Sequence, residues 1–176
     1  MPSNSDTFRK VMGHFATGVT VVTTFDDAGR PAGITVNALS SVSLEPPLIV
    51  IALDRRRFIT PMVHAAGRFA VNILGEHQQA LAHCFAGASV APGRDAFCGA
   101  TWWPGETGLP LLDGAIASLE CTVVETHPVG DHDLFIGQVE ALASGEHDPR
   151  PLLYYRRRYL RLDRAEARTV EGRQGG

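Results

Sequence analysis

The chain has 176 residues, of which 44% are hydrophobic and 20% are charged, and its formal net charge is -3. This composition is typical of an ordinary globular protein, and the length allows one domain with a core of its own. The charge balance argues against nucleic acid as the main partner, because phosphate binding needs a basic excess or a basic face.

The chain begins with a predicted helix. One helix face collects apolar residues at i, i+3, i+4 and i+7, namely Phe8, Val11, Met12 and Phe15. Ser5 or Asp6 is a plausible N-cap, and we expect Gly18 to end the helix.

Strands follow this helix. Residues 20–25 are rich in β-branched side chains and predict a strand, and the turn-forming residues 26–31 make it the first arm of a hairpin into 32–39. Residues 48–53 form a continuous apolar run of strand length, for which we expect burial on both faces.

A second helix is expected to open at Thr60-Pro61. Threonine is a good N-cap, proline fits the first helical position, and Gly67 fits the left-handed position at the end. Residues 69–74 predict the next strand, and residues 78–85 predict a third helix.

The second half begins with a predicted long loop at residues 86–112, and loops of this length are uncommon unless functional. Two long strands are predicted at 115–126 and 133–143, followed by a last strand within 152–162. The polar residues 163–176 predict a frayed tail.

The resulting order has about six strands and three short helices, without a βαβ rhythm or an internal repeat. Strands that cluster as hairpins favour a mainly β fold with short helices, an antiparallel barrel rather than a doubly wound sheet. We expect one domain over residues 1–162. No G-x-G-x-x-G, Walker or G-x-S-x-G motif is present, so the sequence supports neither a Rossmann site nor the common serine hydrolase signature.

The cysteines and histidines predict no metal site. Cys84, Cys98 and Cys121 form no C-x-x-C pair, and the seven histidines lack metal-ligand spacing. We expect core or surface cysteines and a reducing compartment. Because residues 1–6 do not begin a signal peptide and no apolar run is long enough to span a membrane, we predict a cytoplasmic protein without a membrane partner.

Residues 33–47 (GITVNALSSVSLEPP) combine small residues, hydroxyls and one amide between two strand candidates. Such a segment suits a pocket rim that faces a polar planar ligand, since serine and asparagine both donate and accept hydrogen bonds. A plain turn between strands is the alternative. The arginine runs at 55–57 and 156–158 are, by themselves, more typical of solvated faces.

Six motifs occur in a fixed order: FATGVTVVT at 15–23, GITVNALSSVSL at 33–44, PPL at 46–48, FAVNIL at 69–74, GDH at 130–132 and PLLYY at 151–155. Together they closely resemble the short-chain flavin reductases, over residues 8–162. The resemblance implies a split β-barrel homodimer that binds FMN or FAD. It also implies hydride transfer from NADH or NADPH, and a transient partner, a flavin-dependent monooxygenase that receives the reduced flavin. A non-catalytic flavin sensor or store, and an oxidase with its own organic substrate, are the alternatives.

The resemblance also assigns site residues. The wall that meets the flavin comprises Thr35, Val36, Asn37, Ala38, Leu39, Ser40 and Ser41. The flavin phosphate falls to Arg55, Arg56, Arg57 and Thr60 and to the N–H groups of the helix that follows. Here the chain departs from the family, since Arg57 and Phe58 stand where relatives often have a serine.

His132, in the GDH motif, is placed near the nicotinamide by the same resemblance. Direct acid–base work is not required of it, because the two cofactors carry out hydride transfer themselves. Relatives often have a glycine soon after the tyrosines, where this chain has arginines 156–158. For Tyr154, Tyr155, Trp102 and Trp103 we expect packing rather than ligand contact.

Overall fold

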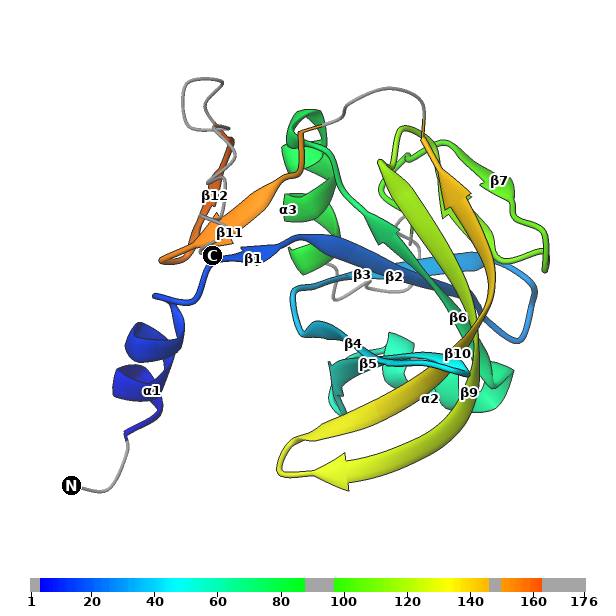
Figure 1. The fold of residues 1–176 in the computed structure, drawn as a ribbon, viewed down its shortest axis with the longest axis horizontal. Coiled ribbons are helices and arrows are strands. Elements are labelled where there is room, and N and C mark those ends of the chain that lie inside the picture. The colour runs from blue at the N-terminus through cyan, green and yellow to red at the C-terminus, as the bar shows by residue number, and fades with distance from the viewer. Residues whose placement is uncertain (1–3, 88–96, 146–149, 163–176) are drawn as a thin grey trace, which may run out of the picture.

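The computed structural model describes residues 4–87, 97–145 and 150–162. Its main feature is a seven-stranded antiparallel sheet in the order β3-β2-β6-β9-β10-β5-β4 (Figure 1). These strands are β2 (Thr20–Phe25), β3 (Pro31–Val36), β4 (Leu39–Leu44), β5 (Pro47–Asp54), β6 (Arg68–Ile73), β9 (Ala117–Val129) and β10 (His132–Ser144). The two edge strands, β3 and β4, are neighbours in the chain, so the sheet has to curl back on itself into a split barrel. The predicted fold class is confirmed.

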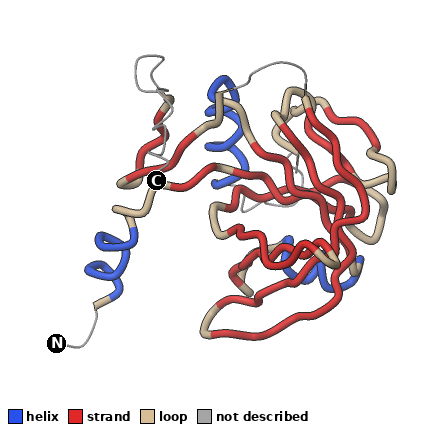
Figure 2. Tube along the Cα trace, in the orientation of Figure 1, coloured by secondary structure: helices blue, strands red, loops and turns tan. Residues whose placement is uncertain are grey.

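Smaller elements surround this barrel (Figure 2). One short sheet has the order β1 (Thr17–Gly18), β11 (Leu153–Tyr155) and β12 (Arg158–Leu160), with β11 in the middle. A second short sheet pairs β7 (Trp102–Pro104) with β8 (Pro110–Leu112). The helices are α1 (Ser5–Met12), α2 (Ile59–Ala66) and α3 (Gln79–Gly87), with a 3-10 turn η1 (Glu76–Gln78). More strands form than the six expected, because the regions predicted as a loop and as a single last strand contain short hairpins.

The barrel interior is filled by alternating side chains. On β5, Ile49, Ile51 and Leu53 are buried in the main core, whereas Val50 and Ala52 are only partly buried. The expected burial of this strand on both faces was therefore wrong for a single chain. Its second face lines a cavity instead.

Two helices close the barrel. On α2, Ile59 and Val63 enter the main core, and α3 covers the outer side of β2 and β3 through Phe85. A Cβ atom on Gly33 would lie 2.7 Å from the ring of Phe85, so only glycine lets this helix approach so closely.

Several predicted element ends require correction. Helix α1 ends at Met12, not Gly18, and its N-cap is Asn4, whose Oδ1 accepts the Asp6 N–H at 3.0 Å. The hairpin turn of β9 and β10 narrows to residues 130 and 131, because both strands run further than predicted. The predicted tail, residues 163–176, lies outside the described residues.

Helix α2 confirms one predicted end and corrects the other. Gly67 has the left-handed conformation expected of it, with φ 63°. Thr60 is not the N-cap, since Phe58 occupies that position and the Thr60 hydroxyl donates to the Asp54 carbonyl at 2.8 Å. A hydroxyl that turns back to the preceding strand is no longer directed at the free N–H groups of the helix.

Asn72 joins three parts of the fold from a fully buried position on β6. Its Nδ2 donates to the Val21 carbonyl and to the Thr23 hydroxyl, both at 3.1 Å. Its Oδ1 accepts the Leu112 N–H at 2.8 Å and the Ser118 hydroxyl at 2.9 Å. One amide thus connects β2, β8 and β9.

A buried carboxylate, Glu120 on β9, fixes the turn between β7 and β8. It accepts the N–H groups of Glu106 at 2.7 Å and Thr107 at 2.9 Å, and the Thr107 hydroxyl. These directed donors offset the cost of burying a charge. Gly105 leaves the room that the carboxylate fills, since a Cβ atom there would collide with it.

Cys84 and Cys98 form a disulfide, so the expectation of unpaired cysteines was wrong for this pair. Phe97 packs edge-on against Phe85 of α3, with ring centroids 5.5 Å apart. This contact places the neighbouring Cys98 beside Cys84 of the same helix. The cysteine pattern therefore no longer supports a reducing compartment. Cys121 is free and buried, and burial raises the pKa of its thiol to about 12.

The predicted last strand is a hairpin. Arg156 and Arg157 form its turn, both with positive φ, where glycine is the usual residue. The Arg156 N–H donates to the Gly13 carbonyl at 2.8 Å, so this turn holds the chain just after α1.

Candidate functional site

The predicted wall, residues 35–41, runs from the end of β3 into β4. Asn37 and Ala38 form the link, and the Ala38 carbonyl accepts the Ala52 N–H of β5 at 3.2 Å. Asn37, Ser40 and Ser41 are exposed, and Leu39 is partly buried. The wall therefore continues the sheet beyond β5 and pairs with the edge of that strand.

Two wall residues direct their side chains elsewhere. The Thr35 hydroxyl donates to the Ala82 carbonyl of α3 at 2.8 Å, and Val36 is buried in the main core. The Val36 carbonyl accepts the Thr20 hydroxyl at 2.7 Å. These residues fix the position of the wall rather than present polar groups to a ligand.

A cavity of about 820 Å³ opens between the wall and the N-terminal segment. Its lining is mainly apolar and comes from α1, β1, the wall, β5 and β10: Phe8, Met12, Phe15, Ala16, Thr17, Gly18, Thr20, Asn37, Ala38, Leu39, Ser40, Val50, Ile51, Ala52, Ile73 and Leu134. Sites of this size and character, with few polar groups, are typical of cofactor binding.

Sequence reasoning missed one polar residue of the cavity lining, Thr17. Its hydroxyl is shielded from solvent and has no hydrogen-bond partner among the described residues. Buried polar groups without a partner are uncommon, but an atom that solvent does not reach in the empty cavity is not presented to a ligand there. Thr17 belongs to the FATG motif, which was the available signal.

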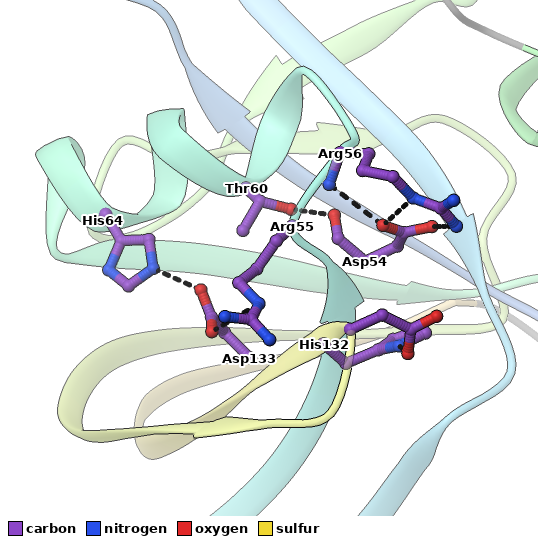
Figure 3. Close-up of polar contacts among 8 residues, drawn as sticks. Asp54, Arg55, Arg56, Thr60, His64, His132 and Asp133 are labelled. Atoms are coloured by element: carbon purple, nitrogen blue, oxygen red, sulfur yellow. Dashed lines mark hydrogen bonds and ion pairs between the residues drawn. The ribbon is translucent and has the colours of Figure 1, made fainter.

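Asp54 organises the arginine loop at the end of β5 (Figure 3). Its carboxylate accepts the Arg56 N–H at 2.9 Å and the guanidinium at 3.0 Å and 2.7 Å, while its carbonyl accepts the Arg57 N–H at 2.9 Å. Thr60 is only 2% exposed and is bound to the same carbonyl. Of the three arginines, Arg57 alone forms no ion pair within the described part of the chain, and it is exposed.

His132 begins β10 directly opposite Asp54 in the strand register. Its Nδ1 lies 2.7 Å from Asp131 Oδ1. An ionised carboxylate only accepts, so Nδ1 carries the proton and Nε2 is left free. Leu134 follows on the same face of the strand and lines the cavity, so His132 lies at the cavity's end of β10.

The next residue, Asp133, points to the opposite face. It is 6% exposed, and its carboxylate lies 2.9 Å from His64 Nε2 of α2 and 3.7 Å from Arg55 Nε (Figure 3). Neither Asp133 nor His64 was among the predicted site residues. The alternation along β10 separates Asp133 from His132, but only the fold brings His64 and Arg55 to it.

Two carboxyl groups near His132, those of Asp54 and Asp131, have lowered pKa values and therefore stay ionised. The Arg56 guanidinium and N–H lower the pKa of Asp54 well below its ordinary value, and the hydrogen bond to His132 lowers that of Asp131. A lowered folded-state pKa stabilises the fold above the ordinary aspartate range, and this stability is lost as pH falls through the lowered pKa. Both pairs are therefore intact near neutral pH.

The structure thus brings the arginine loop and His132 together at the end of β5, and it places the exposed serines of the wall along the edge of the same strand, opposite Val50 and Ile49. Three of the four aromatic residues expected to pack have ring contacts: Trp102 with Phe25 and Phe97, Tyr154 with Tyr159, and Tyr155 with His14. Trp103 is 45% exposed. Within the described residues, no cluster of three histidine, cysteine or acidic side chains could hold a metal ion. No helix of the same residues is both long and apolar enough to cross a membrane.

Comparison with known proteins gives consistent matches. The flavin reductase like domain matches residues 12–163. The reductase subunit HsaB of a flavin-dependent monooxygenase from Mycobacterium tuberculosis is 39% identical over 158 residues, 89% of this chain and 82% of that protein. An NADH-dependent flavin reductase from Rhodococcus is 41% identical over 149 residues, 84% and 80% of the two chains.

A solved structure agrees with these matches. The Streptomyces globisporus NADH:FAD oxidoreductase SgcE6, in complex with NAD and FAD fragments, superposes with a TM-score of 0.85 at 35% identity. The match covers 94% of this chain and 97% of that one. Both the sequence and the fold of this chain are therefore shared along almost its whole length with proteins named as flavin reductases.

Proposed function

Because the chain belongs to the flavin reductase like domain family, we propose that it is an NAD(P)H-dependent flavin reductase that supplies reduced flavin to a partner monooxygenase. The observation that carries this proposal is that the exposed wall pairs along the edge of β5, while the arginine loop and His132 meet at the end of the same strand. A planar ligand with a phosphate needs these three kinds of surface together.

The cavity fits a flavin in size and in chemistry. Its apolar lining suits the ring system, and the exposed side chains of Asn37 and Ser40 offer hydrogen bonds to ring nitrogens and carbonyls. A flavin held here would supply the hydride-accepting ring and the nicotinamide nucleotide the hydride, so the redox chemistry would belong to the two cofactors. The chain's own task is to bind both cofactors, orient them and exclude water.

We assign the phosphate mainly to Arg57. Arg56 is already bound by Asp54, Arg55 is near Asp133, and the Thr60 hydroxyl is buried. Among the described residues the guanidinium of Arg57 has no ion-pair partner, and a guanidinium is the group best suited to a phosphate. Of the four residues predicted to bind the phosphate, we therefore keep Arg57 as the ligand-binding residue. The other three, Arg55, Arg56 and Thr60, shape the loop.

Replacing Arg57 with alanine is expected to weaken FMN binding about tenfold, since a charge-assisted hydrogen bond contributes roughly 1.5 kcal/mol or more. Riboflavin, which lacks the phosphate, should bind as before. Fluorescence titration of both flavins measures the effect. Arg30→Ala, in the distant β2–β3 turn, is the matched control. Equal weakening of both flavins would contradict the phosphate assignment.

His132 is assigned to the nicotinamide. The proton on Nδ1 is held by Asp131, so the free Nε2 is available to accept a hydrogen bond from the carboxamide of the nucleotide. The kinetics of a His132 variant distinguish a binding role from an orienting role. Loss of binding raises KM, whereas loss of orientation lowers kcat.

We also propose a homodimer. On α1, Phe8, Val11 and Met12 are 60%, 64% and 50% exposed, and Phe15 just beyond the helix is 70% exposed. Together with the apolar lining of the open cavity, they form an exposed apolar surface of the kind that marks an interaction site. A second copy that covered this surface would also close the cavity on its open side.

Sedimentation equilibrium at micromolar concentration should therefore give twice the 18.9 kDa chain mass. Phe15→Asp places a charge in the proposed interface and is expected to shift the population toward monomer. Leu142→Asp, an exposed leucine at the far end of β10, should leave the mass unchanged. A wild-type mass of one chain would refute the dimer.

We propose a cytoplasmic location, because the activity consumes NADH or NADPH. The cysteines no longer support this location, since a disulfide is found and cytosolic thiols are usually kept reduced. In that compartment the pair would be exposed to reduction.

The test of function is aerobic oxidation of NADH and of NADPH, each with FMN, FAD and riboflavin. Flavin-dependent turnover with at least one nucleotide is the expected result, and none with either would refute the proposal. Tight flavin binding without nucleotide oxidation would instead identify a flavin store or sensor. Trapping the reduced flavin with an added monooxygenase component would show its transfer.

A further inference from the structure

Arg55 contacts the β9–β10 hairpin on both sides of His132. Its backbone N–H donates to the Asp131 carbonyl at 3.1 Å, and its guanidinium Nε lies 3.7 Å from Asp133 Oδ1. His132 is the residue between these two attachment points. Arg55 thus connects the arginine loop to the hairpin that carries His132 (Figure 3).

Asp133 is the fixed end of this connection. Its carboxylate is almost fully buried, and it lies opposite Leu53 of the barrel core in the strand register. The second oxygen, Oδ2, lies 2.9 Å from His64 Nε2, and the His64 ring packs against Phe135 with centroids 4.7 Å apart. Helix α2 and the core therefore hold the carboxylate in place.

The opposite face of the hairpin has no comparable support. The His132 side chain is 43% exposed, and its one side-chain partner within the described residues, Asp131, is 71% exposed. Exposed pairs of this kind contribute little by themselves, because water competes for both groups. A stable orientation of the imidazole requires that the backbone on either side of it be fixed.

We propose that Asp133 is a positioning residue for His132 and acts through Arg55. The buried carboxylate holds Arg55, and Arg55 holds the Asp131 carbonyl, so the backbone around His132 keeps one geometry. Asp131 can then accept the Nδ1 proton while Nε2 faces the nucleotide. This inference rests on the proposed function of His132 but assigns a role to a residue outside the family motif.

A double-mutant cycle tests the proposal. Asp133→Asn keeps the size of the side chain and removes the charge that attracts Arg55. We expect kcat/KM for the nucleotide to fall roughly tenfold with riboflavin as acceptor, since small misplacements of an orienting group are costly. Riboflavin has no phosphate, so a change in phosphate binding cannot cause the fall.

The combined variant separates positioning from a general loss of structure. If Asp133 acts through His132, then Asp133→Asn added to His132→Gln should lower kcat/KM no further. Arg55→Ala should reproduce the effect of Asp133→Asn, again without effect in the His132→Gln background. Asp27→Asn, at an exposed position in the β2–β3 turn, is the matched control.

A readout without turnover comes from the ring-nitrogen NMR shifts of His132, assigned through His132→Gln. The neutral wild-type ring should show one dominant tautomer with the proton on Nδ1, and Asp133→Asn should move the shifts toward a mixture of the two tautomers. Unchanged shifts, or effects that multiply in the double variant, would overturn the proposal. If wild-type protein shows no flavin-dependent turnover, the proposed function fails, while the NMR comparison still decides the positioning role.

Discussion

Replacing Asn72 with alanine is expected to lower the free energy of unfolding by about 3–4 kcal/mol. The side chain is fully buried and forms four hydrogen bonds to three strands. Alanine would leave the Leu112 N–H and the Ser118 hydroxyl without a partner and would create a cavity. Each unsatisfied buried group costs roughly 1–3 kcal/mol.

Urea denaturation at one fixed protein concentration measures this loss, and fixing the concentration keeps the comparison valid if the proposed dimer forms. Asn37→Ala is the matched control. That asparagine is exposed, so its replacement should change stability by no more than about 0.5 kcal/mol. A loss below about 1 kcal/mol for Asn72→Ala would mean that the four hydrogen bonds do not form as described.

Reduction of the disulfide between Cys84 and Cys98 is expected to cost about 3 kcal/mol of stability, the usual value for a closed loop of about this length. The two cysteines are 14 residues apart in sequence, so the bond restricts a substantial segment of the unfolded chain. It also holds the end of α3 against Phe97. Urea midpoints with and without dithiothreitol measure the loss.

The double variant Cys84→Ser/Cys98→Ser is the control for this experiment. It should have the stability of the reduced wild-type protein, and dithiothreitol should not change it. Cys121 is left intact in the variant, so an effect of the reductant on that thiol would be seen in both proteins. Identical midpoints for oxidised and reduced wild-type protein would show that the bond does not form in solution.

The sequence predicted the barrel well where local pattern and burial agree. The β-branched run at 20–25 became β2, and Gly67 ends α2 because only its left-handed conformation lets the chain turn there. It predicted less where a residue has two possible roles. Thr60 has the chemistry of an N-cap, but it bonds to the strand before the helix instead.

The candidate site shows the same limit. The wall and the GDH motif could be found by resemblance, because both are continuous in sequence. The link from Arg55 to Asp133 and His64 joins a loop, a strand and a helix, and no local pattern specifies it. The disulfide likewise depends on how the chain returns to α3, which spacing between cysteines does not reveal.

Because Cys121 is free and buried, the reactivity of its thiol can be used to follow the opening of the barrel. Of the three cysteines in the chain, two are bonded to each other, and the third has a thiol that is both shielded and protonated at neutral pH. An alkylating reagent can reach that sulfur only after β6, β9 and β10 separate, so the rate of modification follows the opening of the core. The fraction of chains that gain the mass of the reagent then measures how fast the core opens in the oxidised protein, and no engineered label is needed.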